Sequence, residues 1–174
     1  RGMQFYHLKL DIDGKSFFVK SEFWEHRGKG YEEASNAEEA RERLQELGWV
    51  DTVEYKFGYQ DDGGQTFFIS EWLDFPLLRD YMQELRSKIE NLLQVHNAWQ
   101  SDKSAEEWER ELKELEVLRK QEQVLEEKME TIQKILPEFH DLLSWNMFYD
   151  EKDGKIYLFD LFKKPQGIYA NWTL

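Results

Sequence analysis

Apolar and polar residues alternate along the first part of the chain in the manner of paired β-strands. Residues 4–11, QFYHLKLD, carry apolar side chains on one side and polar side chains on the other, which is the period of a half-buried strand. Asp13-Gly14 supplies the positive φ angles of a tight turn and predicts a hairpin to a second strand over 16–24. The same arrangement recurs twice, and it predicts strands over residues 49–59, 66–73, 145–150 and 156–162.

A short helix is predicted between the first two hairpins, over residues 35–47. Ser35 and Glu38 have the spacing of a capping box, in which the serine caps the helix and the glutamate reaches back to its start. Gly48 is suited to end the helix, and residues 26–34 before it are predicted to form a loop. One sector of the helix is apolar and is expected to be buried: Ala37, Ala40, Leu44 and Leu47.

The middle of the chain has a different period. From Leu78 to Trp99 apolar residues recur in alternating steps of four and three, which is typical of a coiled-coil seam. A second apolar stripe runs from Trp108 to Leu136, with a phase change part-way along it. We therefore expect a long antiparallel helical hairpin, a coiled-coil-like arm.

These patterns predict an α+β protein with one antiparallel sheet built from β-hairpins, one short helix and an inserted helical hairpin. Residues 1–73 are the expected ββαββ segment of the sheet domain and 74–136 the helical insertion. Residues 137–174 are expected to return as strands to the same sheet. The three hairpins are thus predicted to share a sheet.

Composition limits the classes of function. The chain has 174 residues, of which 40% are hydrophobic and 16% aromatic, so it can bury a core. Its net charge of −13 argues against direct binding of nucleic acid or of an anionic membrane, and favours a basic partner. The absence of cysteine excludes disulfides and thiolate metal sites and fits a cytoplasmic protein. No stretch approaches the apolar length of a membrane span.

The second strand of each predicted hairpin contains an acid within its apolar run. These acids are Glu22, Glu71 and Asp160. Three carboxylates that converged could bind a divalent cation or act as a general acid and base. Alternation instead directs Glu71 and Asp160 outward, where a lone acid discourages pairing between sheet edges. We interpret the three acids as structural and expect no metal site and no cofactor, although the sequence does not decide whether they converge.

A carboxylate-metal-dependent enzyme remains an alternative at this stage. Glu54 and Lys56 have the acid-x-lysine spacing of a widespread metal-dependent nuclease fold, in which the acid holds the metal and the lysine steadies the attacking water. An acidic strand that contains lysine produces this spacing by chance, and the net charge of the chain repels a nucleic-acid substrate. Cross-strand ion pairing is the favoured interpretation of both residues.

The short helix carries the least compensated charge. Four glutamates lie opposite its apolar sector, and two more lie just before it: Glu38, Glu39, Glu42 and Glu46, with Glu32 and Glu33. Like charges four residues apart destabilise a helix by a few tenths of a kcal/mol. A solvated surface does not need this arrangement, but a row of carboxylates can face a Lys/Arg groove that normally follows phosphates.

The leading hypothesis is a non-enzymatic acidic protein that binds a basic protein partner through these six glutamates. The partner of choice is a nucleic-acid-handling enzyme whose phosphate-binding groove is occupied by the acidic surface. Small acidic phage proteins that block restriction or CRISPR systems offer an analogy. The alternative is a structural protein or homodimer that acts through the helical arm, with Trp99 and Trp108 near its tip as the interface.

Overall fold

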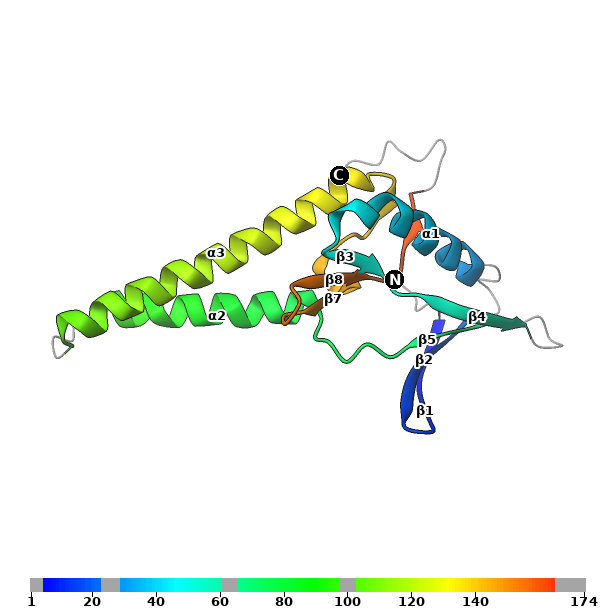
Figure 1. The fold of residues 1–174 in the computed structure, drawn as a ribbon, viewed down its shortest axis with the longest axis horizontal. Helices are drawn as coiled ribbons and strands as arrows, with labels where there is room; N and C mark the ends of the chain where they lie inside the picture. Colours follow the sequence, from blue (N-terminus) through cyan, green and yellow to red (C-terminus); the bar gives the residue numbers. More distant parts are fainter. Residues whose placement is uncertain (1–4, 23–28, 61–65, 98–102, 165–174) are drawn as a thin grey trace.

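The computed structural model describes residues 5–22, 29–60, 66–97 and 103–164, and these residues form an α+β protein with antiparallel sheets and three α-helices (Figure 1). The predicted fold class is therefore confirmed. The arrangement of its strands differs from the prediction, because the strands form three sheets and not one.

The first sheet contains four antiparallel strands in the order β1-β2-β5-β4. Its strands are β1 (Phe5–Ile12), β2 (Lys15–Glu22), β4 (Tyr55–Gln60) and β5 (Thr66–Glu71). Asp13 and Gly14, between β1 and β2, both have left-handed backbone angles, with φ of 49° and 76°. We call this the four-stranded sheet.

The second sheet contains β3 (Val50–Thr52), β7 (Met147–Asp150) and β8 (Lys155–Leu158), in the order β3-β8-β7. Its β3–β8 pair is parallel, and the Val53 amide continues that ladder by donating to the Leu158 carbonyl at 2.8 Å. The third sheet is a two-stranded pair of β6 (Phe139–His140) and β9 (Phe162–Lys163).

The prediction of one common sheet was wrong because the predicted strand 49–59 is divided. Its first part, β3, belongs to the second sheet, and its second part, β4, belongs to the four-stranded sheet. Val50, Thr52 and Val53 are all buried around the break, so an apolar pattern continues through it. Alternation predicts which side chains of a strand are buried, but it does not predict which other strand pairs with it.

Helix α1 (Lys29–Leu44) is continued by a 3-10 turn, η2 (Gln45–Leu47), and ends at Gly48, which has a φ of 68°. The helix begins before the predicted cap at Ser35, which lies exposed within it. The earlier turns are held by packing, since the Tyr31 ring meets the Phe68 ring edge-on with their centroids 5.4 Å apart. Helix α1 thus lies against one face of the four-stranded sheet.

Helices α2 (Leu78–Asn97) and α3 (Ala105–Ile135) extend together to one side of the sheets and diverge as they approach them (Figure 1). Arg86 of α2 bridges them by donating to Glu122 and Glu126 of α3, at 2.5 and 2.9 Å. Four residues of the predicted α2 stripe are buried, Leu78, Met82, Leu85 and Ile89, and Leu92 is half-buried, while the side chains of His96 and Trp99 lie outside the described part. Leu112 of the predicted α3 stripe is 48% exposed. The main core lies where α1, α2, α3 and the second sheet meet, and includes Leu44, Leu78, Ile132, Leu136, Met147, Ile156 and Leu158.

Candidate functional site

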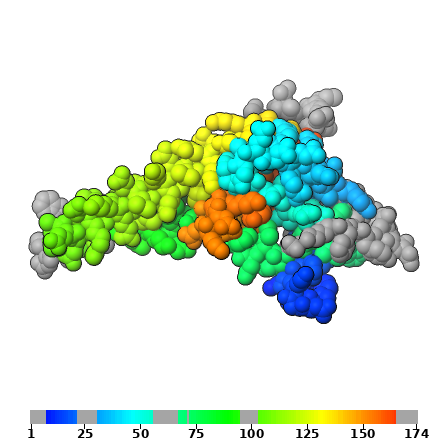
Figure 2. Space-filling model, viewed as in Figure 1, coloured from blue at the N-terminus to red at the C-terminus, as the bar shows by residue number. Residues whose placement is uncertain are grey.

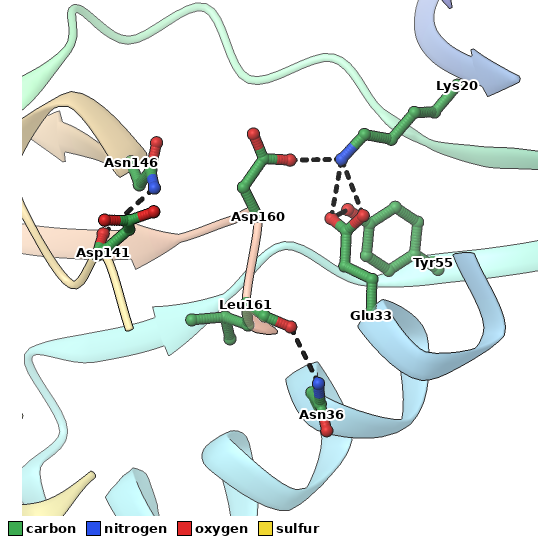
Figure 3. Close-up of polar contacts among 8 residues, drawn as sticks. All are labelled: Lys20, Glu33, Asn36, Tyr55, Asp141, Asn146, Asp160 and Leu161. Carbon is green, nitrogen blue, oxygen red and sulfur yellow. Dashed lines mark hydrogen bonds and ion pairs between the residues drawn. The ribbon is translucent and has the colours of Figure 1, made fainter. Parts of the chain in front are cut away.

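A buried ionic cluster joins three parts of the fold (Figure 3). Lys20 of β2 is 2% exposed, and its ammonium group donates to both carboxylate oxygens of Glu33, at 2.8 and 2.7 Å. It also donates to Asp160, in the loop between β8 and β9. Glu33 of α1 is 1% exposed and accepts a further hydrogen bond from the Tyr55 hydroxyl of β4. We call these four residues the Lys20 cluster.

The position of Lys20 follows from strand alternation. Lys20 lies opposite Phe68, and Phe18 lies opposite Ser70, in the β2–β5 register. Residues two apart on a strand point to the same face, so these four residues share the inner face of the four-stranded sheet, on which α1 packs. The lysine ammonium is therefore carried into the interior and must find acids there.

A left-handed turn directs the Asp160 carboxylate back toward Lys20. Asp160 has a φ of 55°, a conformation that aspartate tolerates better than most residues. The loop is held on both sides of this residue, since the Phe159 amide donates to the Asn146 carbonyl at 3.1 Å and the Asn36 side chain donates to the Leu161 carbonyl at 2.9 Å. Figure 3 shows one carboxylate oxygen of Asp160 on Lys20 and the other directed away from it.

Burial and the neighbouring charges change the protonation of the Lys20 cluster. Burial raises the pKa of Glu33 above its ordinary value of 4.5, the charge of Lys20 opposes this shift, and the charge of Asp160 reinforces it. Burial also raises the pKa of Tyr55 well above 10.0, together with the adjacent Glu33 carboxylate. The Tyr55 hydroxyl therefore keeps its proton and donates a hydrogen bond. The cluster contains two acids, Glu33 and Asp160, and one base, Lys20.

A small cavity adjoins the Lys20 cluster. Its volume is about 130 Å³, and its walls come from β2, β4, β5 and β7 and from the segments that follow β3, β5 and β8. Five aromatic residues line it together with Lys20, Asp160 and Ser70: Phe18, Tyr55, Trp72, Phe148 and Phe159. Asp160 is 33% exposed, so its carboxylate lies where the cavity meets solvent.

The outward orientation predicted for Asp160 was wrong. The left-handed turn ends the alternation of β8 before residue 160 and places its carboxylate on a buried lysine. The side chains of Glu22 and Glu71 lie outside the described residues, so the three hairpin acids are not compared further. The signal that the sequence did carry was Lys20, a charged residue in phase with Phe18 within an apolar run.

The six predicted glutamates divide into two groups. Glu38, Glu42 and Glu46 are exposed and form no ion pair with a described residue; we call them the acidic row. Glu39 is paired with Lys163 at 2.6 Å, and Glu32 is half-buried. Glu33 does not belong to an exposed acidic surface, because it lies in the Lys20 cluster.

Both arginines of α1 are engaged away from the acidic row. Arg41 donates to Asp51 at 3.0 Å and to the Thr52 carbonyl at 3.1 Å. Arg43 donates to Glu138 and to the Ile135 carbonyl. Burial alone would raise the pKa of Asp51, but the hydrogen bonds from Thr52 and Arg41 and the charge of Lys155 lower it. These contacts tie α1 to β3 and α3 and leave its outer face acidic.

The outer face of the four-stranded sheet is apolar and partly exposed. Leu8, Leu10 and Ile12 of β1 are 60%, 37% and 48% exposed. Leu8 lies opposite Val19, which lies opposite Ile69, so the apolar surface continues across the sheet. Figure 2 shows the β1–β2 hairpin standing away from the body of the molecule. Alternation alone did not reveal this surface, because it does not show which face of a sheet is covered.

The remaining predicted site residues are not brought together. Trp99 lies outside the described residues, and Trp108 is half-buried with the Lys103 ammonium 5.4 Å from its ring centre. Glu54 is exposed, and the Lys56 side chain lies outside the described part. Among the described residues, no three His, Asp or Glu side chains gather in a way that could hold a metal ion. None of the described helices has the length and apolar character needed to cross a bilayer.

A scan against protein-family models found no match to this chain, and a search of curated protein sequences found none either.

Proposed function

We propose that this chain is a non-enzymatic protein-binding protein that recognises a basic partner through the acidic row on α1 and η2. The observation that carries the proposal is the state of the charges on this helix. Its two arginines are engaged by Asp51 and Glu138, while the three exposed glutamates have no basic partner among the described residues. Glu38 and Glu42 are four residues apart on α1, so they lie on the same side of the helix, and Glu46 follows four residues later in η2.

The other helices pair three of their exposed acids within the helix, although Glu90, Glu106, Glu114 and Glu116 are also exposed and form no ion pair with a described residue. Glu84, Glu109 and Glu130 each pair with a lysine four residues later on the same helix, Lys88, Lys113 and Lys134. Such pairs are the ordinary arrangement of a solvated helix. The acidic row differs because its unpaired glutamates follow one another at four-residue spacing, which favours a surface that meets a complementary charge on another protein.

The finer proposal is that the partner handles nucleic acid and that the acidic row occupies its phosphate-binding groove. Carboxylates on a helix face resemble a phosphate backbone in charge and present it to the same lysines and arginines. The protein then acts as an inhibitor, of the kind that small phage anti-defence proteins represent. Two outcomes follow from this version: DNA or RNA should compete with the protein for its partner, and the partner's activity on nucleic acid should fall.

The test compares two variants with the same change in net charge. The first reverses the acidic row with Glu38→Lys, Glu42→Lys and Glu46→Lys. The control reverses Glu84, Glu109 and Glu130, which are also exposed helix residues. A partner captured from host or target cells at low salt is then purified, and its affinity for each variant is measured by calorimetry at two salt concentrations.

The acidic-row variant should lose about tenfold or more in affinity, and the control should stay within about threefold of the unmodified protein. Equal losses would mean that net charge alone drives the association, which would overturn the assignment to α1. Binding that resists both salt and the acidic-row variant would overturn the electrostatic proposal altogether.

A second candidate, self-association, is favoured by the exposed apolar face of β1. β1 is an edge strand of the four-stranded sheet, and an edge strand can pair with a copy of itself. A second copy packed against the outer face, instead of against the edge, would cover Leu8, Leu10 and Ile12. The coiled-coil packing predicted for the arm, with Trp99 and Trp108, is the other route to a homodimer and stays a prediction. Sedimentation over a wide range of concentrations tests both routes, since a monomer throughout would exclude them.

A further inference from the structure

Two buried polar atoms beside the Lys20 cluster have no hydrogen-bond partner in the part of the chain that the structure describes. They are the hydroxyl oxygen of Ser70 and the indole nitrogen of Trp72, and neither has a partner among the described residues. Ser70 is 1% exposed. Leaving such a group unpaired in the interior costs about 1–3 kcal/mol, and folded proteins contain few of them.

The two unpaired groups belong to one place. Both residues line the 130 Å³ cavity that adjoins the Lys20 cluster. They are two apart along the chain, and the Trp72 amide extends the β5 ladder by donating to the Ser16 carbonyl at 3.2 Å, so both lie on the inner face of the sheet. A ligand in the cavity would give both groups a partner at once.

The Asp160 carboxylate is the third polar group of the cavity. One of its oxygens accepts from Lys20, and the other accepts no hydrogen bond from a described residue (Figure 3). It is an acceptor and needs a donor. The Trp72 indole is a donor only and needs an acceptor, while the Ser70 hydroxyl can serve as either.

These requirements select a class of ligand. A cation without an acceptor would leave the Trp72 N–H unpaired, and an anion would meet two acids against one lysine in the Lys20 cluster. The walls are mainly aromatic, which favours a flat ring that stacks on them. An apolar cavity of about 150 Å³ in another protein holds one benzene molecule, so a single ring suits this volume.

We propose that this cavity binds a single-ring heteroaromatic molecule that carries a carbonyl acceptor beside an N–H donor, the arrangement found in pyrimidine bases and pyridones. The ring lies among Phe18, Trp72 and Phe159, its carbonyl accepts from Trp72 and Ser70, and its N–H donates to Asp160. Lys20 does not touch the ring in this arrangement. Its role is to hold the Asp160 carboxylate in place.

The test uses three probes of similar size with the intact protein, measured by calorimetry and ligand-observed NMR. Uracil presents both the acceptor and the donor, benzene presents only the ring, and tetramethylammonium presents only a positive charge. Uracil should bind with a Kd of about 1 mM or tighter, a value within reach of a ligand of this size. The other two probes should bind at least about tenfold more weakly, because they leave Trp72 or Asp160 unpaired.

Two variants assign the binding to the cavity. Ser70→Ala and Trp72→Phe each remove one hydrogen-bonding group and should weaken uracil binding by about three- to tenfold. Ser87→Ala is the matched control, because its hydroxyl donates within α2 to the Gln83 carbonyl. It should leave the uracil affinity within about twofold.

A thermal melt separates a binding role from a structural role for Ser70. If its hydroxyl has no partner in the free protein, Ser70→Ala should melt at the same temperature as the unmodified protein or slightly higher. A clearly lower melting temperature would show that the hydroxyl is already paired and would overturn the proposal. Failure of uracil to bind at its solubility limit, or equal binding of benzene, would overturn it as well.

Discussion

Each face of the four-stranded sheet departs from the usual distribution of residues at particular positions. The inner face buries a lysine, and that lysine is paired with a buried glutamate from α1. The outer face leaves Leu8 60% and Ile12 48% exposed. Sheets with one covered face usually place apolar residues inward and polar residues outward. Hydrophobic burial alone therefore does not explain why a lysine is buried on the inner face while Leu8 and Ile12 are exposed on the outer face.

The two faces therefore differ in role: the inner face fixes the geometry of the fold, and the outer face is suited to contact with another molecule. A buried ion pair contributes little net stability, because the removal of charges from water offsets most of their attraction. What the Lys20 cluster does is fix geometry, since it joins β2, α1 and the loop after β8 at one point. Leu8, Leu10 and Ile12 leave apolar area exposed on one face of the sheet, and surfaces of that kind are typical of contact with another molecule.

The largest effect is expected from Lys20→Met, which breaks the inner face. The substitution removes the only cation of the cluster and leaves the buried Glu33 carboxylate and the partly exposed Asp160 carboxylate close together without a counter-charge. Breaking a buried ion pair in this way costs about 3–5 kcal/mol of the free energy of unfolding. Urea denaturation at neutral pH measures it. Lys15→Met, at an exposed position of the same strand, is the matched control and should change stability by about 0.5 kcal/mol or less.

A double variant checks the cause of that loss. Glu33→Gln added to Lys20→Met removes one of the two uncompensated carboxylates, so the double variant should be more stable than Lys20→Met alone. If the second substitution made the protein less stable still, the loss would come from packing and not from charge. If Lys20→Met itself cost less than about 1 kcal/mol, Lys20 would not be buried among acids as described.

A smaller loss is expected from Asn36→Ala, which releases the loop that carries Asp160. The Asn36 side chain is buried and donates to the Leu161 carbonyl at 2.9 Å, so the substitution leaves a buried carbonyl without its donor. The expected cost is about 1–3 kcal/mol in urea denaturation. Asn91→Ala, at an exposed position of α2, is the control and should change stability by about 0.5 kcal/mol or less. Equal effects in the two variants would mean that Asn36 does not hold the loop.

The residues of the inner face show what the sequence could and could not predict. The α+β class and the buried stripe of α2 follow from local periodicity, and the local pattern is enough to find them. The Lys20 cluster depends on residues 20, 33 and 160, which meet only after the chain has packed. Alternation predicted the wrong side for Asp160, because a left-handed turn resets the pattern. The sequence does show Lys20 as a charged residue on the apolar side of a strand. It does not show that Glu33 and Asp160 are its partners.

A pH-dependent effect is expected from Glu33→Gln. The pKa of Glu33 is raised above 4.5 in the folded protein, so the folded state holds this proton more tightly than the unfolded state. The stability that results is fully present below about pH 4.5 and is lost as the pH rises through the folded pKa. The advantage of the unmodified protein over Glu33→Gln should therefore be larger at pH 5 than at pH 8. Urea titrations at the two pH values measure it, and an advantage that grows with pH would contradict the raised pKa.

The smallest effect is expected from Leu8→Thr, on the outer face. Threonine suits a strand, and Leu8 is 60% exposed, so the free energy of unfolding should change by about 0.5 kcal/mol or less at low protein concentration. Phe68→Thr, on the inner face and 3% exposed, should cost about 3–5 kcal/mol in the same assay. If the Leu8→Thr cost instead rises with protein concentration, a second copy covers the outer face, and the two faces differ in what they bind and not in whether they are buried. If the cost is large at every concentration, Leu8 is covered within the chain itself, and the contrast between the faces fails.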